Sequence, residues 1–217
     1  MRRPVRIWID TANLDEIRQW RQHPWVSGFT TNPTLMRWVD DGHEGLHRLS
    51  KMDGMAWAQD AVAAADGYPI SIDGPEEVWE LGPNVYRKMI HPAPLPKVGQ
   101  KINWTAICMK QQLWNSRKQV ERRPSSEVVS VFAGRIMDTG RDPQPVIDAA
   151  KATGAQVLWA SVREPYNLVQ AEASGCDIIT VPPAIFQKYL DWYGKPLETV
   201  AQETIAQFDR DREGLWT

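Results

Sequence analysis

Eight short apolar runs, separated for the most part by helical patterns, recur along this chain of 217 residues and constrain its fold more than any other feature. Most of the runs are continuously apolar rather than alternating, which is typical of parallel strands that are buried on both faces. Eight strand–helix units in one domain predict a (β/α)8 barrel. The predicted strands cover residues 6–10, 28–30, 69–73, 85–89, 101–106, 128–132, 156–160 and 177–180.

The helical patterns between these runs support the same architecture. Asn13 followed by Glu16 resembles a capping box that opens the first helix, and Gly67, Gly154 and Gly175 stand where three later helices are expected to end. The predicted helices cover residues 14–22, 55–66, 109–122, 143–153, 164–174 and 182–190, and a last amphipathic segment at 197–212 has no strand after it.

An open, doubly wound sheet is the alternative architecture. Such sheets bind their ligands with a phosphate loop or a glycine-rich dinucleotide fingerprint. The sequence contains neither motif, so this alternative predicts no binding site. We therefore expect one barrel domain over residues 1–217. Its helical layer is expected to be thin at two places, because residues 74–84 are few and three prolines within residues 92–96 exclude a regular helix.

The composition excludes several classes of partner. The net charge of −2 gives no global electrostatic support for binding to nucleic acid or to an anionic membrane. No apolar stretch approaches the roughly 20 residues that span a bilayer, and the first apolar run is too short for a signal peptide, so a cytoplasmic location is expected. Two cysteines, Cys108 and Cys176, make neither a disulfide framework nor a metal cluster, and we expect them to be buried free thiols.

Polar side chains fall at or near the carboxyl ends of the predicted strands. In a barrel these ends meet at one mouth, where active sites of this fold lie. The residues are Asp10, Thr30, Thr31, Asn32, Ser71, Asp73, Lys88, Thr105, Arg135, Ser161 and Arg163.

The chemistry of this set can be interpreted from the residue types alone. Lys88 lies in an apolar strand, and desolvation lowers the pKa of an ammonium group and exposes the nucleophilic amine that a Schiff base with a ketone requires. A neighbouring carboxylate could move protons while a carbon–carbon bond is cleaved. Two arginines and a serine can bind a phosphate group.

Four segments resemble one known family. DTANLDEI (10–17) followed by GFTTNPTLM (28–36) resembles the opening of the transaldolases, specifically the short branch that includes fructose-6-phosphate aldolase. Two later segments, 129–138 and 157–186, are similar to further motifs of that family, so the resemblance covers most of the chain.

The resemblance implies a role for each matching residue. Lys88 would form the Schiff base, and Asp10 would be the general acid and base at the hydroxyl beside the bond that breaks. Thr31 and Asn32 would hydrogen-bond the bound dihydroxyacetone unit, and Thr105 would help to hold a catalytic water.

The remaining matches concern the phosphate and the type of reaction. Arg135, Ser161 and Arg163 match the residues that bind the phosphate in the family. Phe132 falls where the aldolases carry a tyrosine and the transaldolases a phenylalanine.

The chain departs from the family pattern on two strands. The glutamate or glutamine of the third strand is replaced by Asp73, or by Ser71 if the alignment is shifted; we prefer Asp73, because a carboxylate can relay protons. The segment after Lys88 also differs, so this assignment depends on strand context, with Lys97 and Lys101 as the near rivals.

The resemblance therefore implies a transaldolase of carbohydrate metabolism in the pentose phosphate pathway. Such an enzyme transfers a dihydroxyacetone unit from fructose 6-phosphate or sedoheptulose 7-phosphate to an aldose phosphate. The protonated imine accepts the electrons, so no metal or organic cofactor is expected. The alternatives are an aldolase-like lyase that releases dihydroxyacetone and a non-catalytic homologue that binds sugar phosphates. Short members form homo-oligomers, pentamers or decamers, and residues 197–212 resemble the helical arm that packs on a neighbouring subunit.

Overall fold

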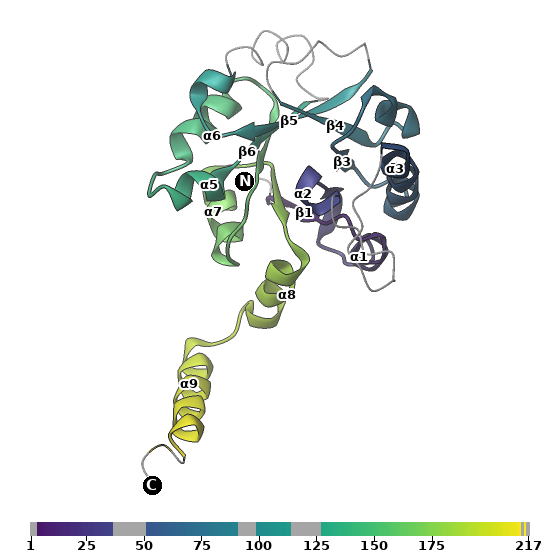
Figure 1. Ribbon diagram of the computed structural model, residues 1–217. Helices are drawn as coiled ribbons and strands as arrows, with labels where there is room; N and C mark the ends of the chain where they lie inside the picture. The colour runs from purple at the N-terminus through teal and green to yellow at the C-terminus, as the bar shows by residue number, and fades with distance from the viewer. Residues whose placement is uncertain (1–3, 37–50, 91–98, 114–126, 214, 216–217) are drawn as a thin grey trace.

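Eight parallel strands close into a barrel in sequence order in the computed structural model, which describes residues 4–36, 51–90, 99–113, 127–213 and 215. Each strand pairs with the next one along the chain, and β8 pairs with β1 (Figure 1). This closed sheet confirms the (β/α)8 barrel and excludes the open sheet. The strands are β1 (Arg6–Asp10), β2 (Val26–Thr30), β3 (Ile70–Ile72), β4 (Val85–Met89), β5 (Lys101–Ile107), β6 (Glu127–Val131), β7 (Gln156–Trp159) and β8 (Ile178–Val181).

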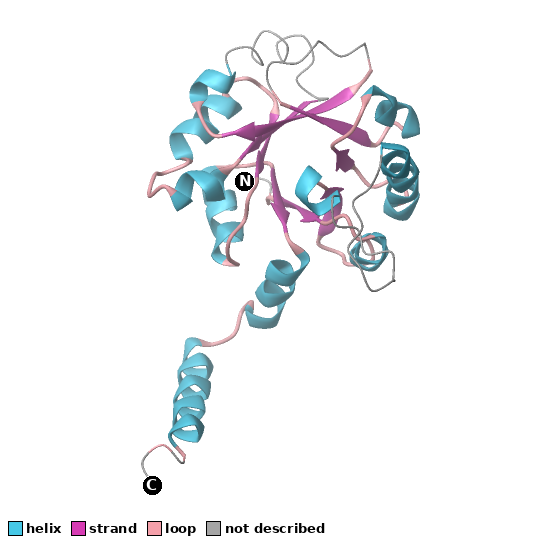
Figure 2. Cartoon of the chain, in the orientation of Figure 1, coloured by secondary structure: helices cyan, strands magenta, loops and turns pink. Residues whose placement is uncertain are grey.

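Helices surround this barrel as the sequence pattern predicts (Figure 2). Asn13 caps the first helix by accepting the amide N–H groups of Asp15 and Glu16. The second half of the predicted capping box does not form, because the Glu16 carboxylate accepts the hydroxyl of Thr11 instead. The helices are α1 (Leu14–Trp20), α2 (Pro33–Met36), α3 (Lys51–Ala65), α5 (Ala133–Asp138), α6 (Gln144–Lys151), α7 (Tyr166–Ser174), α8 (Pro183–Trp192) and α9 (Leu197–Arg212).

The connection between β3 and β4 is as thin as its length predicts. It contains a single 3-10 helix, η1 (Glu76–Leu81), in place of an α-helix. The proline-rich connection after β4 falls on residues 91–98, which lie outside the described residues, as does most of the helix predicted over 109–122. The described part of that helix is a short 3-10 turn, η2 (Lys110–Gln112). Helix α5, by contrast, was not predicted, because its six residues are too few to show a helical period.

Apolar side chains close the bottom of the barrel. The indole of Trp8 on β1 meets the ring of Tyr86 on β4 edge to face, with the ring centroids 5.8 Å apart, and both side chains are buried. A Cβ atom at Gly28 on the neighbouring strand would lie 2.6 Å from the Trp8 indole, so only glycine leaves room for it. Val128, Leu158 and Ile178 pack with Trp8 and Tyr86 in the same buried apolar cluster. Any cavity inside the barrel must therefore open at the other end, where the strands finish.

Helix α9 stands away from the barrel (Figure 1). None of its residues is buried, and Leu197, Ile205 and Phe208 expose apolar side chains along one stripe of the helix. Within the described ranges, no helix combines the length and the apolar character needed to cross a bilayer. Both cysteines are free thiols; Cys176 is buried as expected, whereas Cys108 is only partly buried.

Candidate active site

A cavity of about 420 Å³ opens at the carboxyl ends of the strands. Ten of the twelve residues that the sequence analysis selected line it, namely nine of the polar residues and Phe132. They are Asp10, Thr30, Asn32, Asp73, Lys88, Thr105, Phe132, Arg135, Ser161 and Arg163. Residues from seven of the eight strands, or from the turns that follow them, thus meet at one mouth, as the barrel fold predicts.

The carboxylate of Asp10 is oriented by hydrogen bonds from β2 and the turn after it. The Thr30 hydroxyl donates to Oδ1 of Asp10 over 2.7 Å, and Nδ2 of Asn32 donates to Oδ2 over 3.4 Å. The Thr30 hydroxyl also contacts the hydroxyl of Thr180 on β8. These contacts leave Asp10 partly exposed to the cavity, with each of its two carboxylate oxygens oriented by one hydrogen bond.

Lys88 lines the cavity together with Asp10 and Asp73, and the charges of both carboxylates act on its amine. Burial lowers the pKa of its amine, and the negative charges of Asp10 and Asp73 oppose that shift only in part. Burial likewise raises the pKa of Asp73, which the positive charges of Lys88 and Arg87 oppose. The amine is therefore poised to lose its proton more readily than an exposed lysine, which is the property that a nucleophilic lysine needs.

A chain of buried polar side chains lies beneath this group. Asn103 on β5 donates to the Ser71 hydroxyl over 2.9 Å, and Ser130 on β6 donates to the Asn103 carbonyl over 2.6 Å. Ser130 lines the cavity, whereas the fully buried Ser71 does not. Sequence reasoning missed Asn103 and Ser130. The period of two along a strand could have found them, because they stand two residues before Thr105 and Phe132.

Thr31 lies outside the cavity, contrary to the expectation that it faces a substrate. Its side chain is fully buried, and its hydroxyl finds no hydrogen-bond partner among the described residues. Its backbone N–H donates to the carbonyl of Ser71, which ties the end of β2 to β3. The cause is the alternation of side chains along the chain: Thr30 and Asn32 face Asp10, so Thr31 faces away.

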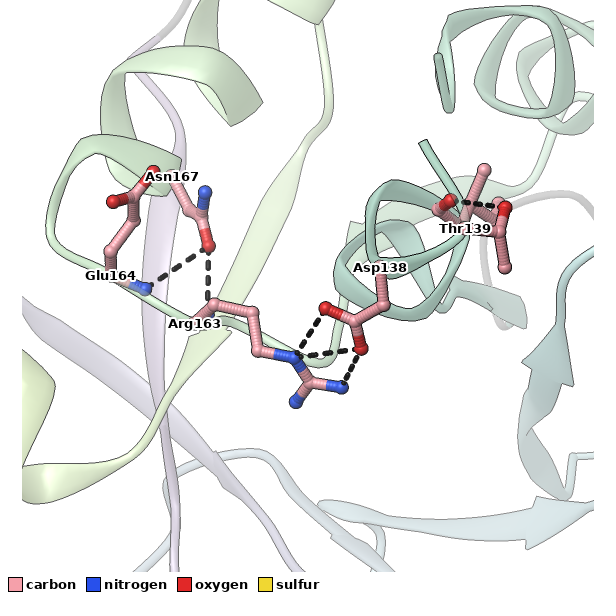
Figure 3. A network of polar contacts seen from close by, with 6 residues as sticks. Asp138, Thr139, Arg163, Glu164 and Asn167 are labelled. Atoms are coloured by element: carbon pink, nitrogen blue, oxygen red, sulfur yellow. Dashed lines mark hydrogen bonds and ion pairs between the residues drawn. The ribbon is translucent and has the colours of Figure 1, made fainter. Parts of the chain in front are cut away.

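The two arginines reach the cavity from neighbouring connections. Arg135 belongs to α5, and Arg163 precedes α7. The Arg163 guanidinium donates from Nε to both oxygens of Asp138, over 3.2 and 3.1 Å, and from Nη2 to Oδ2 over 2.5 Å (Figure 3). This pair raises the pKa of Arg163 and lowers that of Asp138. Oδ1 of Asn167 accepts the Arg163 backbone N–H over 2.8 Å, which anchors the residue at the start of α7 (Figure 3).

The connections after β6 and β7 pack backbone against backbone. The Gly134 N–H donates to the carbonyl of Ala160 over 3.3 Å, and a Cβ atom at Gly134 would lie 1.6 Å from the carbonyl oxygen of Ser161. Ser161 itself has a φ of 66°, in the left-handed region. Glycine is therefore required at 134, and the close approach brings the segment of Ser161 and Arg163 against the start of α5, which carries Arg135.

The arrangement can support amine chemistry beside an anion site. A desolvated lysine shares the cavity with two carboxylates that interact with its charge, and two guanidinium groups line the same cavity. Within the part of the chain that the structure describes, there is no group of three or more histidine, cysteine or acidic side chains placed to hold a metal ion.

Comparison with known proteins agrees with the fold and the set of residues in the cavity. The barrel, with its polar groups at the carboxyl ends of the strands, places the chain among the (β/α)8-barrel proteins. A family model described as transaldolase/fructose-6-phosphate aldolase matches residues 93–216. The chain belongs to this family.

Curated relatives named probable transaldolases align with this chain over most of their length. A probable transaldolase from Syntrophomonas wolfei subsp. wolfei is 30% identical over 198 residues, which cover 85% of this chain and 90% of that protein. A probable transaldolase from Nitrosopumilus maritimus is 28% identical over 214 residues, which cover 93% of each chain. Among solved structures, a putative dehydratase from Mesorhizobium loti superposes with a TM-score of 0.51 at 13% identity, over 83% of this chain and 56% of that one. This last likeness shows the fold alone.

Proposed function

We propose that this chain is a class I transaldolase in which Lys88 forms a Schiff base with a ketose phosphate, fructose 6-phosphate or sedoheptulose 7-phosphate. The dihydroxyacetone unit is then transferred to an aldose phosphate. One observation carries the proposal: the Lys88 amine lies in the cavity with a lowered pKa, and its ionic neighbours there are Asp10 and Asp73. Family membership supports the reaction class.

The first half of the reaction joins the amine to the donor. The neutral amine of Lys88 attacks the C2 carbonyl of the ketose, and the carbinolamine takes up a proton and loses water to give a protonated imine. Asp73 and Thr105 both line the cavity and would hold the water that relays protons in this step. Asp73 suits this role better than Ser71, because the Ser71 hydroxyl lies below the cavity and is engaged by Asn103.

The second half breaks and remakes the carbon–carbon bond. Asp10 takes the proton of the C4 hydroxyl, the C3–C4 bond breaks, and its electrons pass to the protonated imine to give an enamine on Lys88. The aldose phosphate leaves and another enters. The enamine then attacks the new aldehyde, Asp10 returns its proton to the resulting alkoxide, and hydrolysis of the imine releases the product. The protein supplies all of these groups itself, so the proposed mechanism invokes no cofactor.

Substrate binding is assigned to the remaining residues of the cavity. Asn32 would hydrogen-bond the hydroxyl groups of the dihydroxyacetone unit, and Arg135, Ser161 and Arg163 would bind the phosphate of donor and acceptor. The Phe132 ring also lines the cavity, and the Arg135 guanidinium lies over it at 5.8 Å. Because Phe132 offers no hydroxyl to a water, it favours transfer over simple release of dihydroxyacetone.

Borohydride trapping tests the Schiff base directly. Reduction of the protein in the presence of fructose 6-phosphate should attach the reduced adduct to Lys88, as peptide mass spectrometry would show. Lys88→Met should abolish the label. Lys101→Met should keep it, because Lys101 begins β5 at the closed end of the barrel and its amine lies over the Tyr86 ring. A label on a different lysine, or none on the wild type, would overturn the assignment.

The acceptor dependence distinguishes the transferase from the lyase. Release of free dihydroxyacetone from fructose 6-phosphate should be slow without an aldose phosphate, while transfer to an added aldose phosphate should be fast. Release at the same rate with and without acceptor would instead establish the aldolase. Binding of the ketose with no turnover in either assay would establish a non-catalytic sugar-phosphate-binding homologue.

The proposal extends to assembly and location. The exposed apolar stripe of α9, with Leu197 79% exposed, supports a homo-oligomer, a pentamer or decamer, in which this helix packs on a neighbouring copy. With phosphorylated sugars as the proposed substrates, we propose a cytoplasmic enzyme of the pentose phosphate pathway. Nucleic acid and membrane are not among the proposed partners.

A further inference from the structure

Arg87 lies next to Lys88 on β4 and points to the opposite side of the barrel wall. Successive side chains of a strand alternate between its two faces, so Lys88 enters the cavity while Arg87 faces the outer layer. There, Nε of Arg87 donates to the carbonyl oxygen of Gly74 over 2.9 Å. Its guanidinium also lies 4.8 Å from the centre of the Trp79 ring. Arg87 thus contacts two points of the segment that connects β3 to β4.

This connecting segment is thin. It has one 3-10 helix, η1, where most other units of the barrel have an α-helix. The Trp79 indole donates to the carbonyl of Lys101 over 2.8 Å, which fixes the middle of η1 to the start of β5. Arg87 completes the attachment by holding Gly74, at the entrance to the segment.

The hydrogen bond to Gly74 affects the cavity through Asp73, the residue before Gly74, which lines the cavity. Asp73 is the first residue after β3, and Gly74 follows it directly. The last residue of β3, Ile72, pairs with Arg87 in the sheet register. The backbone on either side of Asp73 is therefore tied to the same residue of β4, on one side by strand pairing and on the other by the Arg87 side chain.

We propose that Arg87 is a positioning residue that acts through Asp73: it holds the backbone after β3 so that the Asp73 carboxylate faces the Lys88 amine. The role rests on the proposed function, in which Asp73 relays protons during formation of the imine. Arg87 does not line the cavity, so in this proposal it makes no contact with the substrate. The planar guanidinium suits this task, since one side chain can donate to a carbonyl and cover an indole ring at the same time.

Substitution of Arg87 by methionine tests the proposal against a matched control. Arg21 provides the control, because its Nη1 donates to the carbonyl of Ala64 over 3.1 Å and joins α1 to α3, far from the cavity. For Arg87→Met we expect kcat to fall by roughly ten- to a hundredfold, the cost typical of a misplaced catalytic group, with KM within about twofold. Arg87→Lys should recover part of kcat, and Arg21→Met should leave it at the wild-type value.

A double substitution separates positioning from general loss of structure. In the Asp73→Asn background, Arg87→Met should cause no further fall in kcat, because the carboxylate that it positions is already absent. The same fold-loss in both backgrounds, a wild-type kcat for Arg87→Met, or an equal loss in Arg21→Met would each overturn the inference.

Failure of the proposed function gives a different result. If the wild type forms no borohydride adduct, the Schiff-base mechanism is wrong, and crystal structures of the two arginine variants then decide the question of positioning. A displaced Asp73 in Arg87→Met, with Asp73 in place in Arg21→Met, would support the role of Arg87. Asp73 beside Lys88 in both variants would overturn it.

Discussion

The carboxylate of Asp138 holds the guanidinium of Arg163 through Nε and Nη2, although the two residues belong to different strand–helix units of the barrel. Arg163 lines the cavity and Asp138 does not. The Asp138 carboxylate therefore binds the Arg163 guanidinium from outside the cavity lining. Both side chains are about half exposed, so the ion pair contributes little to stability. Its effect is to fix the orientation of the Arg163 guanidinium at the cavity.

Arg163→Lys is expected to weaken binding of phosphorylated ketose while leaving the chemistry intact. A lysine cannot keep the bidentate contact with Asp138 and also bind a phosphate. We therefore expect KM for fructose 6-phosphate to rise about tenfold or more, with kcat within a few-fold. Steady-state kinetics measures both values. Arg141→Lys, at an exposed position just after α5, serves as the control, and an equal change in that variant would contradict the role of Arg163.

Gly134→Ala is expected to destabilise the protein strongly. The new Cβ would lie 1.6 Å from the carbonyl oxygen of Ser161, so the two connections would have to separate. We expect a loss of roughly 3 kcal/mol or more in the free energy of unfolding. Gly54→Ala is the matched control, because a Cβ there meets no atom within 4 Å and the residue lies in α3. That change should stabilise the fold by about 0.5–1 kcal/mol. Denaturant unfolding of both variants decides, and a wild-type stability for Gly134→Ala would refute the close approach.

Formation of the Schiff base should depend on pH through Lys88. Only the neutral amine attacks the ketone, so the rate falls as pH drops through the pKa of Lys88, which burial lowers. Asp73→Asn removes a negative charge that raises this pKa, so the acidic limb of the profile should move to lower pH. The rate of borohydride trapping across pH measures the limb. Asp66→Asn, an exposed carboxylate at the end of α3, should leave it unchanged, and a shift to higher pH in Asp73→Asn would contradict the assignment.

Charges placed on the apolar stripe of α9 should disrupt assembly without unfolding the barrel. Ile205 and Phe208 are 61% and 57% exposed and contribute nothing to the core of their own subunit. We therefore expect Ile205→Glu with Phe208→Glu to lower the sedimenting mass and to leave the melting temperature of the barrel nearly unchanged. Gln202→Glu, also exposed on α9, should keep the oligomer. A monomeric wild type would refute the proposed assembly.

The positions of the strands were predictable because buried parallel strands leave a local signal. Two strands, Arg6–Asp10 and Val85–Met89, begin and end at the predicted residues, and the other six differ by one or two residues at one end or at both. The short helix Ala133–Asp138 was missed for the opposite reason: six residues carry too little periodic pattern to be distinguished from a loop.

The sequence by itself determined the barrel, the family motifs and the set of polar residues at the strand ends, since each of these depends on residue types at short spacings. The tertiary structure alone decided which of them share a cavity. It turned Thr31 away, placed Ser71 beneath the cavity beside Asn103, and joined Arg163 to Asp138. The last two contacts connect residues 32 and 25 positions apart, and no local pattern encodes them. They arise when the closed sheet brings its strand ends together, and so does the contact of Arg87 with Gly74.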